Sequence, residues 1–232
     1  TMLQPLTVTG EKIDRSLAET STSVAIFDAQ ALQQRPGLET TRDALARVPN
    51  VVTTGANNFA PTVRGIDGTG PTNGGYPFVA GIRPRVNLQI DGRPTSFNEL
   101  VYGNNSLWDV EQMEVLRGPQ STIQGRNAIA GAVIVKTKDP TWDWEGGVRL
   151  LGGSYDMRQG AAFVSGPIIE DQLAFRLAAD RQTSETFVRG NQPFAGVDDP
   201  EEFESNALRG KLLIETRKLD AFCTLVTVNY NK

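Results

Sequence analysis

The sequence predicts an α+β domain followed by the opening strands of an antiparallel β-sheet. Up to Pro140, short apolar segments alternate with helix-capping residues and with glycine or proline bends. After Pro140, apolar and polar residues alternate with a period of two, as in strands whose two faces differ. With 23 glycines and 13 prolines among 232 residues, the composition suits turn-rich β structure better than a helical bundle. We therefore expect three parts, at residues 1–12, 13–140 and 141–232.

Local signals predict one strand and two short helices in the first third of the chain. Ser23–Asp28 has the composition of a strand, and Asp28 is placed to cap a helix that ends near Pro36. Thr40–Asp43 resembles a capping box with aspartate in place of glutamate, and Pro49 closes the helix that it starts. Thr62–Gly65 then forms the end of a strand.

The second half of the α+β domain is built around its last stretch, residues 110–140. In Met113–Arg117, we expect Met113, Val115 and Arg117 on one face and Glu114 and Leu116 on the other. The other expected elements are a strand at 86–90, a turn at 91–94, a helical turn within 105–111, a turn at 118–119, a glycine-rich bend at 120–131 and a strand at 133–137.

Beyond Pro140, three apolar stripes of alternating residues stand out. They are Leu173, Phe175, Leu177 and Ala179, opposed by Arg176, Asp180 and Gln182; Leu208, Leu212 and Ile214, opposed by Arg209, Lys211 and Glu215; and Phe222, Thr224, Val226, Val228 and Tyr230. Two less regular strands are expected at 145–151 and 158–165. An apolar outer face and a polar inner face suit a membrane β-barrel, but a soluble sandwich gives the same alternation.

Several classes of protein are excluded by what the composition lacks. Without any histidine, the chain cannot hold a Ser-His triad, an imidazole base or a histidine-ligated metal. Its single cysteine, Cys223, cannot form an internal disulfide or a cysteine zinc site, and we interpret it as a small buried or lipid-facing residue. A net charge of −4 argues against nucleic-acid binding. We expect no catalytic residue, no resident metal and no cofactor.

The remaining sequence signals for catalysis or for membrane helices are also negative. Gly65, Gly68 and Gly70 do not make a G-x-G-x-x-G motif, and no phosphate-binding loop motif occurs. We expect the carboxylates of residues 91, 109, 111 and 114 to pair with arginines or cap turns, in preference to acting as paired catalytic carboxylates. No apolar run approaches the roughly 18 residues of a membrane helix. No charged segment followed by an apolar run opens the chain, so we expect any signal peptide to have been removed.

Five phrases of the sequence resemble, in order, those of TonB-dependent outer-membrane receptors. They are LTVTG at 6–10, DALARVPNV at 43–51, TVRG at 62–65, IDGRP at 90–94 and VEQMEVLRGPQSTIQGRNAIAGAVIVKTKDP at 110–140. The last departs from the family pattern at Ala132, where the family carries the second glycine of a pair. The resemblance implies an α+β plug domain followed by the opening antiparallel strands, about four or five, of an incomplete transmembrane β-barrel.

The function implied by the resemblance is energised uptake of a scarce nutrient across the bacterial outer membrane, most often a ferric siderophore. The ligand binds at outer loops and the plug apex. The signal passes to a TonB box, an N-terminal peptide that pairs with the C-terminal domain of TonB by strand addition. Outer-membrane lipid surrounds the wall, and no catalysis is involved.

Site residues follow from the same resemblance. The TonB box matches Leu6, Thr7, Val8, Thr9 and Gly10. Ligand contacts are expected at Asn57, Asn58, Phe59, Tyr76 and Phe78, which lie in glycine- and asparagine-rich segments. Contacts between plug and wall are expected at Arg64, Arg117 and Glu114. An arginine at a strand end would be partly buried and would need a carboxylate, which the wall supplies.

Loop lengths favour the membrane alternative. If the first wall strand runs outward, residues 165–172 and 216–220 are short inner turns, whereas 152–156 and 184–206 are outer loops. The second outer loop carries an acidic run, which we interpret as a solvated loop in preference to a cation or ligand site: Asp198, Asp199, Glu201, Glu202 and Glu204.

The length of the chain limits this interpretation. Such transporters close with about 22 strands, each of about 9 to 11 residues, whereas about 90 residues follow Pro140. We therefore expect a fragment of a longer receptor, or a truncated product that does not transport unaided. The alternative from another class is a soluble periplasmic binding or signalling module built on a plug-like domain. An enzyme of unfamiliar type is disfavoured by the missing histidines.

Overall fold

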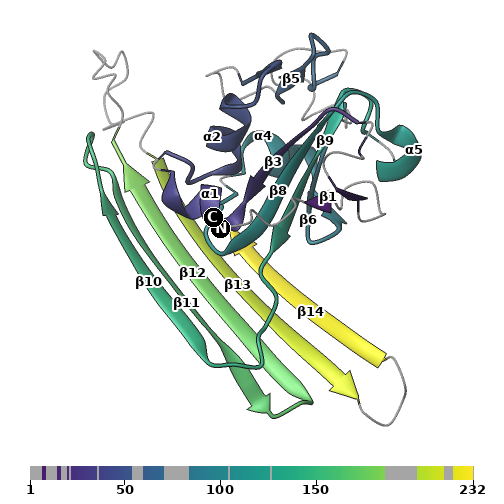
Figure 1. The fold of residues 1–232 in the computed structure, drawn as a ribbon. Coiled ribbons are helices and arrows are strands. Elements are labelled where there is room, and N and C mark those ends of the chain that lie inside the picture. Colours follow the sequence, from purple (N-terminus) through teal and green to yellow (C-terminus); the bar gives the residue numbers. More distant parts are fainter. Residues whose placement is uncertain are drawn as a thin grey trace. The chain divides into compact units, whose positions relative to one another are not determined.

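The computed structural model describes residues 7–8, 15–16, 20, 22–35, 37–53, 60–70, 84–103, 105–125, 127–185, 203–216 and 222–231. The chain divides into two compact units, Thr1–Lys138 and Asp139–Lys232 (Figure 1). The first unit is a mixed α/β domain and the second a five-stranded antiparallel sheet, which confirms the predicted fold class.

The first unit is organised around a five-stranded sheet. Its strands lie in the order β3 (Val24–Asp28), β8 (Val110–Arg117), β9 (Gly131–Thr137), β6 (Val86–Ile90) and β7 (Arg93–Pro94). β6 and β9 are parallel, and the other neighbours are antiparallel. Two small hairpins accompany this sheet: β1 (Thr7–Val8) with β2 (Arg15–Ser16), and β4 (Val51–Val52) with β5 (Thr62–Val63).

The helices of the first unit start where their caps predict. Asp28 accepts a hydrogen bond from the amide of Ala31 at 2.7 Å and caps α1 (Ala29–Gln34). Thr40 and Asp43 form the predicted capping box of α2 (Thr41–Ala46). Because each cap bonds orphan backbone amides within three residues, the sequence alone identifies it.

The helical turn expected within 105–111 is wrong. The helix before β8 is α4 (Phe97–Val101), and residues 105–109 form a bridge and a turn. Its signal was present in the sequence, because Ser96 and Glu99 are a capping box, S-x-x-E. The bend expected at 120–131 likewise contains a short helix, α5 (Ser121–Gln124).

The two faces of β8 serve different purposes, as its alternation predicts. Met113 and Val115 join the main hydrophobic core, which also contains Leu32 of α1 and Leu45 of α2. Leu116 faces the other way into a small cluster with Ala128 and Ala132, and Glu114 shares that side. The helices α1 and α2 therefore pack on one face of the sheet, while the other face combines this small apolar cluster with polar side chains such as Gln112 and Glu114.

The second unit is a meander in sequence order. Its strands are β10 (Glu145–Gly152), β11 (Arg158–Ile169), β12 (Leu173–Ser184), β13 (Phe203–Thr216) and β14 (Phe222–Asn231), all antiparallel to their neighbours. The turn expected at 165–172 is wrong in extent, because β11 continues through Pro167 with a register irregularity and ends at Ile169. Most of the acidic run lies outside the described residues, but Glu204 lies within β13.

The predicted apolar stripes lie on one face of this sheet. Cross-strand pairs join Phe175 to Leu212, and Leu212 to Val226. Among the described residues, this face carries many large exposed hydrophobic side chains: Val148, Leu150, Val164, Leu177, Leu208, Leu212, Ile214, Val226, Val228 and Tyr230. We call it the apolar face. No helix among the described residues is long and apolar enough to cross a membrane.

Adding a methyl group at Gly131 should destabilise the fold, whereas adding one at Gly152 should not. A Cβ at Gly131 would lie 2.6 Å from the carbonyl oxygen of Leu116, so we expect Gly131→Ala to lower the free energy of unfolding by about 1–3 kcal/mol. Urea denaturation followed by tryptophan fluorescence measures this loss. Gly152→Ala is the control, because a Cβ there meets nothing within 4 Å. Equal stability of both variants would contradict the close approach of β8 and β9.

Candidate functional site

The strand register gives the sheet of the first unit two distinct ends. Val135 of β9 lies beside both Ile90 and Met113, and Thr137 beside Val110. At the other end, Gly131 lies beside both Val86 and Arg117. We call these the Gln112 end and the Arg117 end. Because β8 and β9 span both, they connect whatever is bound at the two ends.

The N-terminal peptide is held at the Gln112 end. Thr7 and Val8 pair with Ser16 and Arg15, and the side chain of Val8 is fully buried, at 0% exposure. Gln112 Nε2 donates to the carbonyl oxygen of Thr7 at 2.8 Å. We call this contact the Gln112 latch. Of the predicted TonB box, Thr7 and Val8 are described, whereas Leu6, Thr9 and Gly10 lie outside the described residues.

A buried carboxylate supports the latch from within the same strand. Gln112 Nε2 also donates to Glu114 Oε1 at 2.7 Å, and Glu114 is buried on the face of the sheet opposite the main core. Two amide hydrogens on one nitrogen can satisfy both acceptors, so the carboxylate fixes the orientation of the amide. The latch therefore links the peptide to β8, the second strand of the sheet.

A carboxylate clamp, formed by Asp91 and Thr137, fixes the end of β9 at the Gln112 end of the sheet. Asp91, at φ 50°, accepts from the amide and the hydroxyl of Thr137 at 2.8 and 2.7 Å. Through these two contacts Asp91 bonds a residue 46 positions away and not its own turn, and Glu111 pairs with a lysine, Lys136, and not with an arginine, so both contacts differ from what we expected of these carboxylates. The clamp fixes the last residue of β9 next to the β6–β7 turn.

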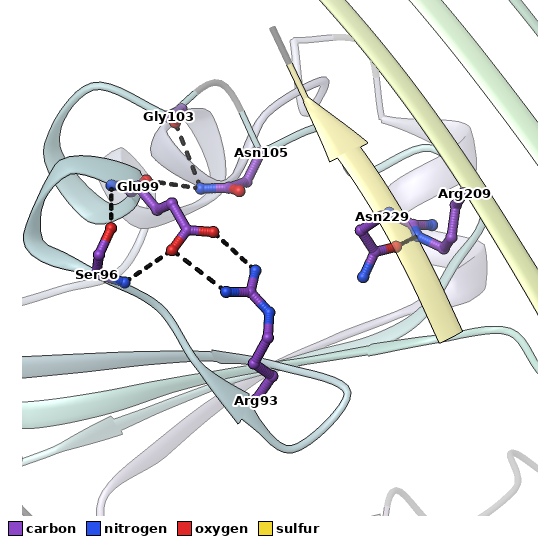
Figure 2. Close-up of polar contacts among 7 residues, drawn as sticks. All are labelled: Arg93, Ser96, Glu99, Gly103, Asn105, Arg209 and Asn229. Atoms are coloured by element: carbon purple, nitrogen blue, oxygen red, sulfur yellow. Dashed lines mark hydrogen bonds and ion pairs between the residues drawn. The ribbon is translucent and has the colours of Figure 1, made fainter. Parts of the chain in front are cut away.

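A second polar network stabilises the corner between β7 and α4 (Figure 2). Arg93 donates to both carboxylate oxygens of Glu99, at 2.7 and 3.3 Å, and Glu99 also accepts from the amide of Ser96. Asn105 donates to the carbonyl oxygen of Glu99 at 3.0 Å. The hydrogen bonds from Arg93 lower the pKa of Glu99, with a smaller contribution from the Ser96 amide, and the same pair raises the pKa of Arg93.

Two of the predicted plug–wall residues lie together at the Arg117 end. Arg64, at φ 50°, is exposed, and Arg117 Nη1 donates to the carbonyl oxygen of Pro49 at 3.0 Å. The expected partial burial is therefore found for Arg117 and not for Arg64. Arg117 Nε is buried and has no hydrogen-bond partner within the described part of the chain. Glu114, the third predicted residue, lies on the opposite face of β8.

The predicted ligand residues fall outside the described part of the chain: Asn57, Asn58, Phe59, Tyr76 and Phe78. The described residues that flank them converge on the Arg117 end. The amide of Arg85 donates to Gly68 at 2.7 Å, and the amide of Ala130 donates to Arg85 at 2.9 Å. Ala60 and Thr69 are joined by a hydrogen bond of 2.9 Å. The described flanking residues are therefore anchored at the end of the sheet opposite the latch.

The face of the second unit opposite the apolar face is polar and internally paired. Arg176 forms an ion pair with Glu145 and lies 4.6 Å over the ring of Phe163, and Lys211 pairs with Asp139 at 2.8 Å. Gln159 donates to Asp180 at 2.8 Å. Arg209 donates to Asn229 at 3.2 Å, as Figure 2 shows. Most of the large exposed apolar side chains therefore lie on one face of this sheet, and the charged pairs of Arg176 and Lys211 lie on the other.

Comparison with known proteins decides the family. Residues 16–132, just over half of the chain, match the model of the TonB-dependent receptor plug domain. The chain belongs to the TonB-dependent receptor family. Members of this family are receptors and not enzymes.

Relatives extend the match past the plug domain. The chain is 31% identical over 179 residues to the ferrioxamine receptor of Yersinia enterocolitica, covering 75% of this chain and 23% of the relative. It is 30% identical over 190 residues to the probable TonB-dependent siderophore receptor PirA of Acinetobacter baumannii, covering 71% of this chain and 23% of the relative. The chain thus spans about a quarter of the length of these curated relatives.

Solved structures show the same fold across both units. The ferripyoverdine receptor of the Pseudomonas aeruginosa outer membrane superposes with a TM-score of 0.76 at 20% identity, covering 98% of this chain and 27% of that one. The alcaligin outer-membrane receptor FauA of Bordetella pertussis gives a TM-score of 0.74 at 19% identity, covering 97% of this chain and 34% of that one.

The Arg93–Glu99 pair predicts a pH dependence at the β7–α4 corner. Because the pKa of Glu99 is lowered in the folded chain, its stabilisation is full above the ordinary glutamate range and is lost as pH falls through the folded value. Both side chains are substantially exposed, so we expect a loss of about 0.2–1 kcal/mol. Hydrogen exchange of the α4 amides between neutral and acidic pH measures it. Glu99→Gln should remove most of this pH dependence, and an unchanged profile would contradict the assignment.

Proposed function

We propose that the chain forms the plug and the first wall strands of an outer-membrane receptor that imports a ferric siderophore with energy from TonB. The observation that carries this proposal is the apolar face of β10–β14, in a chain whose first unit is a TonB-dependent receptor plug. We assign residues 13–140 to the plug and 141–232 to the wall.

The large side chains of the apolar face would be unfavourably exposed in water and are better suited to contact with lipid hydrocarbon. Leu150 is 79% exposed and Val228 is 66% exposed, on strands at opposite edges of the sheet. Soluble proteins rarely expose a contiguous apolar surface that extends across a whole sheet. Hydrocarbon solvates such a face at no cost, whereas the opposite polar face suits the interior of a membrane wall. The alternative of a soluble periplasmic module leaves this surface in water, so we set it aside.

The N-terminal peptide is the contact for TonB in this proposal. An extended peptide recruits a partner strand through its backbone groups. Here the side chain of Val8 is buried, β1 already pairs with β2, and Gln112 holds the carbonyl oxygen of Thr7. The peptide must therefore leave the Gln112 latch before a strand of TonB can pair with Thr7 and Val8. TonB then transmits the proton-motive force of the inner membrane to the plug through Leu6–Gly10.

The Arg117 end is the ligand side. We propose that Asn57, Asn58, Phe59, Tyr76 and Phe78 contact the ligand, because their flanking residues are anchored at this end. The ligand class comes from the relatives, whose names include a ferrioxamine receptor and a probable siderophore receptor.

Contacts between plug and wall complete the proposal. Arg64 and Arg117 would meet wall carboxylates, and the unsatisfied Nε of Arg117 gives that residue a reason to do so. Glu114 contributes by holding Gln112. Transport itself belongs to a protein longer than this chain, since the matched three quarters of the chain correspond to only 23% of each relative.

The membrane-wall assignment predicts opposite outcomes for two adjacent leucines. Leu212 lies on the apolar face, and Leu213 points to the polar face. Leu212→Arg should weaken partition of the chain into phospholipid vesicles by about 2–4 kcal/mol, because it places a charge in hydrocarbon. Leu213→Arg should change partition far less. Vesicle flotation measures both, with circular dichroism to verify folding. Equal partition of the two variants would sink the assignment.

The TonB-box assignment predicts binding to the isolated C-terminal domain of TonB. A peptide of residues 1–15 lacks the latch and should shift the amide resonances of that domain in an NMR titration. The same peptide with Val8→Pro should bind more weakly, because proline removes a backbone donor. The absence of any shift with the unmodified peptide would count against the assignment.

In the whole chain, the latch should oppose this binding. Gln112→Ala removes the hydrogen bond to Thr7, so we expect affinity for the TonB domain to rise about fivefold, as loss of roughly 1 kcal/mol of restraint implies. Gln89→Ala is the matched control, because Gln89 Nε2 donates to Gln124 Oε1 and not to the carbonyl oxygen of Thr7. Equal affinities for the two variants would show that the latch does not restrain the peptide.

A further inference from the structure

A trough crosses the apolar face of the second unit. It is a shallow, open depression of about 530 Å³, and small residues of β11 and β12 form its floor: Gly160, Ala162 and Ala179. Val148 and Leu150 of β10 line one side, and Leu208 and Tyr230 line the other. The absence of large side chains at three neighbouring positions creates the depression between taller neighbours.

The trough has the chemistry of an alkyl-chain site. Apart from Arg181, Asp180 and Asn206, its lining residues are apolar or are the aromatic Tyr230. Dispersion contacts are lost wherever a gap is left unfilled, and a flexible hydrocarbon chain can follow such a gap closely. In the membrane proposed above, lipid acyl chains are the ligand within reach of this face.

Two arginines lie at one end of the trough, on the same face. Arg181 lines the trough and pairs across the strands with Gly160, and Arg158 lies two residues from Gly160 along β11. Such diagonal neighbours lie about 7–8 Å apart, close enough for one phosphate to bridge two guanidinium groups. Their side chains are 74% and 68% exposed, for Arg158 and Arg181.

Both arginines already have acidic neighbours, but these pairs leave donors available. Asp156 accepts from Nε and Nη2 of Arg158, and Glu204 lies 3.3 Å from Nη2 of Arg181. A guanidinium carries five N–H donors. Exposed ion pairs of this kind contribute little stability, so a doubly charged phosphate monoester can add to them or replace them.

We propose that this trough binds a phosphorylated membrane lipid, with one acyl chain along Gly160, Ala162 and Ala179 and the phosphate on Arg158 and Arg181. The inference rests on the proposed membrane wall and names the lipid class that this part of the wall selects. A neutral or zwitterionic lipid would fill the trough but leave the arginines without a phosphate monoester.

Native mass spectrometry of the chain in detergent micelles tests the headgroup. The probes are dioleoyl phosphatidic acid and dioleoyl phosphatidylcholine, which share acyl chains. We expect preferential binding of phosphatidic acid, and about tenfold weaker binding of it by Arg158→Gln/Arg181→Gln, as the loss of charged hydrogen bonds implies. Arg35→Gln, which removes an exposed cation from the other unit, should leave binding unchanged. Equal binding of the two lipids, or an unaffected double variant, overturns the proposal.

A second variant tests the acyl site. Gly160→Leu should fill the trough and weaken binding of both lipids, and the strand should tolerate it because a Cβ there meets only Leu150 Cδ2, at 3.8 Å, within 4 Å. Unchanged lipid binding by this variant overturns the trough as the acyl site. Vesicle flotation separates the two proposals. A chain that enters phosphatidylcholine vesicles without headgroup preference overturns this inference alone, whereas a chain that enters no vesicle overturns the membrane wall as well.

Discussion

Strict alternation of side chains along a strand is the constraint on which both units depend. Each strand residue can serve only one face, so a strand between two environments must carry two independent sets of residues. In β8, Met113 and Val115 fill the core while Gln112 and Glu114 hold the N-terminal peptide on the other side. In the second unit the same rule separates an apolar face from a face of paired charges.

The local parts of this structure could be predicted from the sequence, since their causes lie within a few residues. The Asp28 cap and the Thr40–Asp43 box are contacts over three residues. The turn at Asp91-Gly92 needs positive φ at both positions, which aspartate and glycine tolerate. The Ser96–Glu99 box is a signal of the same kind, and it places the start of α4 at Phe97, ahead of the helical turn expected within 105–111.

The candidate site could be predicted only in part, because its contacts join distant residues. The latch links Gln112 to Thr7 across 105 positions, and the sequence pattern around either residue does not indicate that the other is its partner. Periodicity identified the apolar stripes but could not locate the trough, which depends on three small residues becoming neighbours through the register of β11 and β12. The family phrases identified the plug, although the residues expected to contact the ligand lie outside the described segments.

The side-chain amide of Gln112 donates to the backbone carbonyl oxygen of Thr7, and every amino acid at position 7 would offer this same acceptor. Retention of the peptide at rest is thus independent of the Thr7 side chain. Under the proposed function, substitutions at this position can retune the choice of energy-transducing partner without altering the resting state. Storage and recognition can therefore diverge separately as receptor and transducer evolve together.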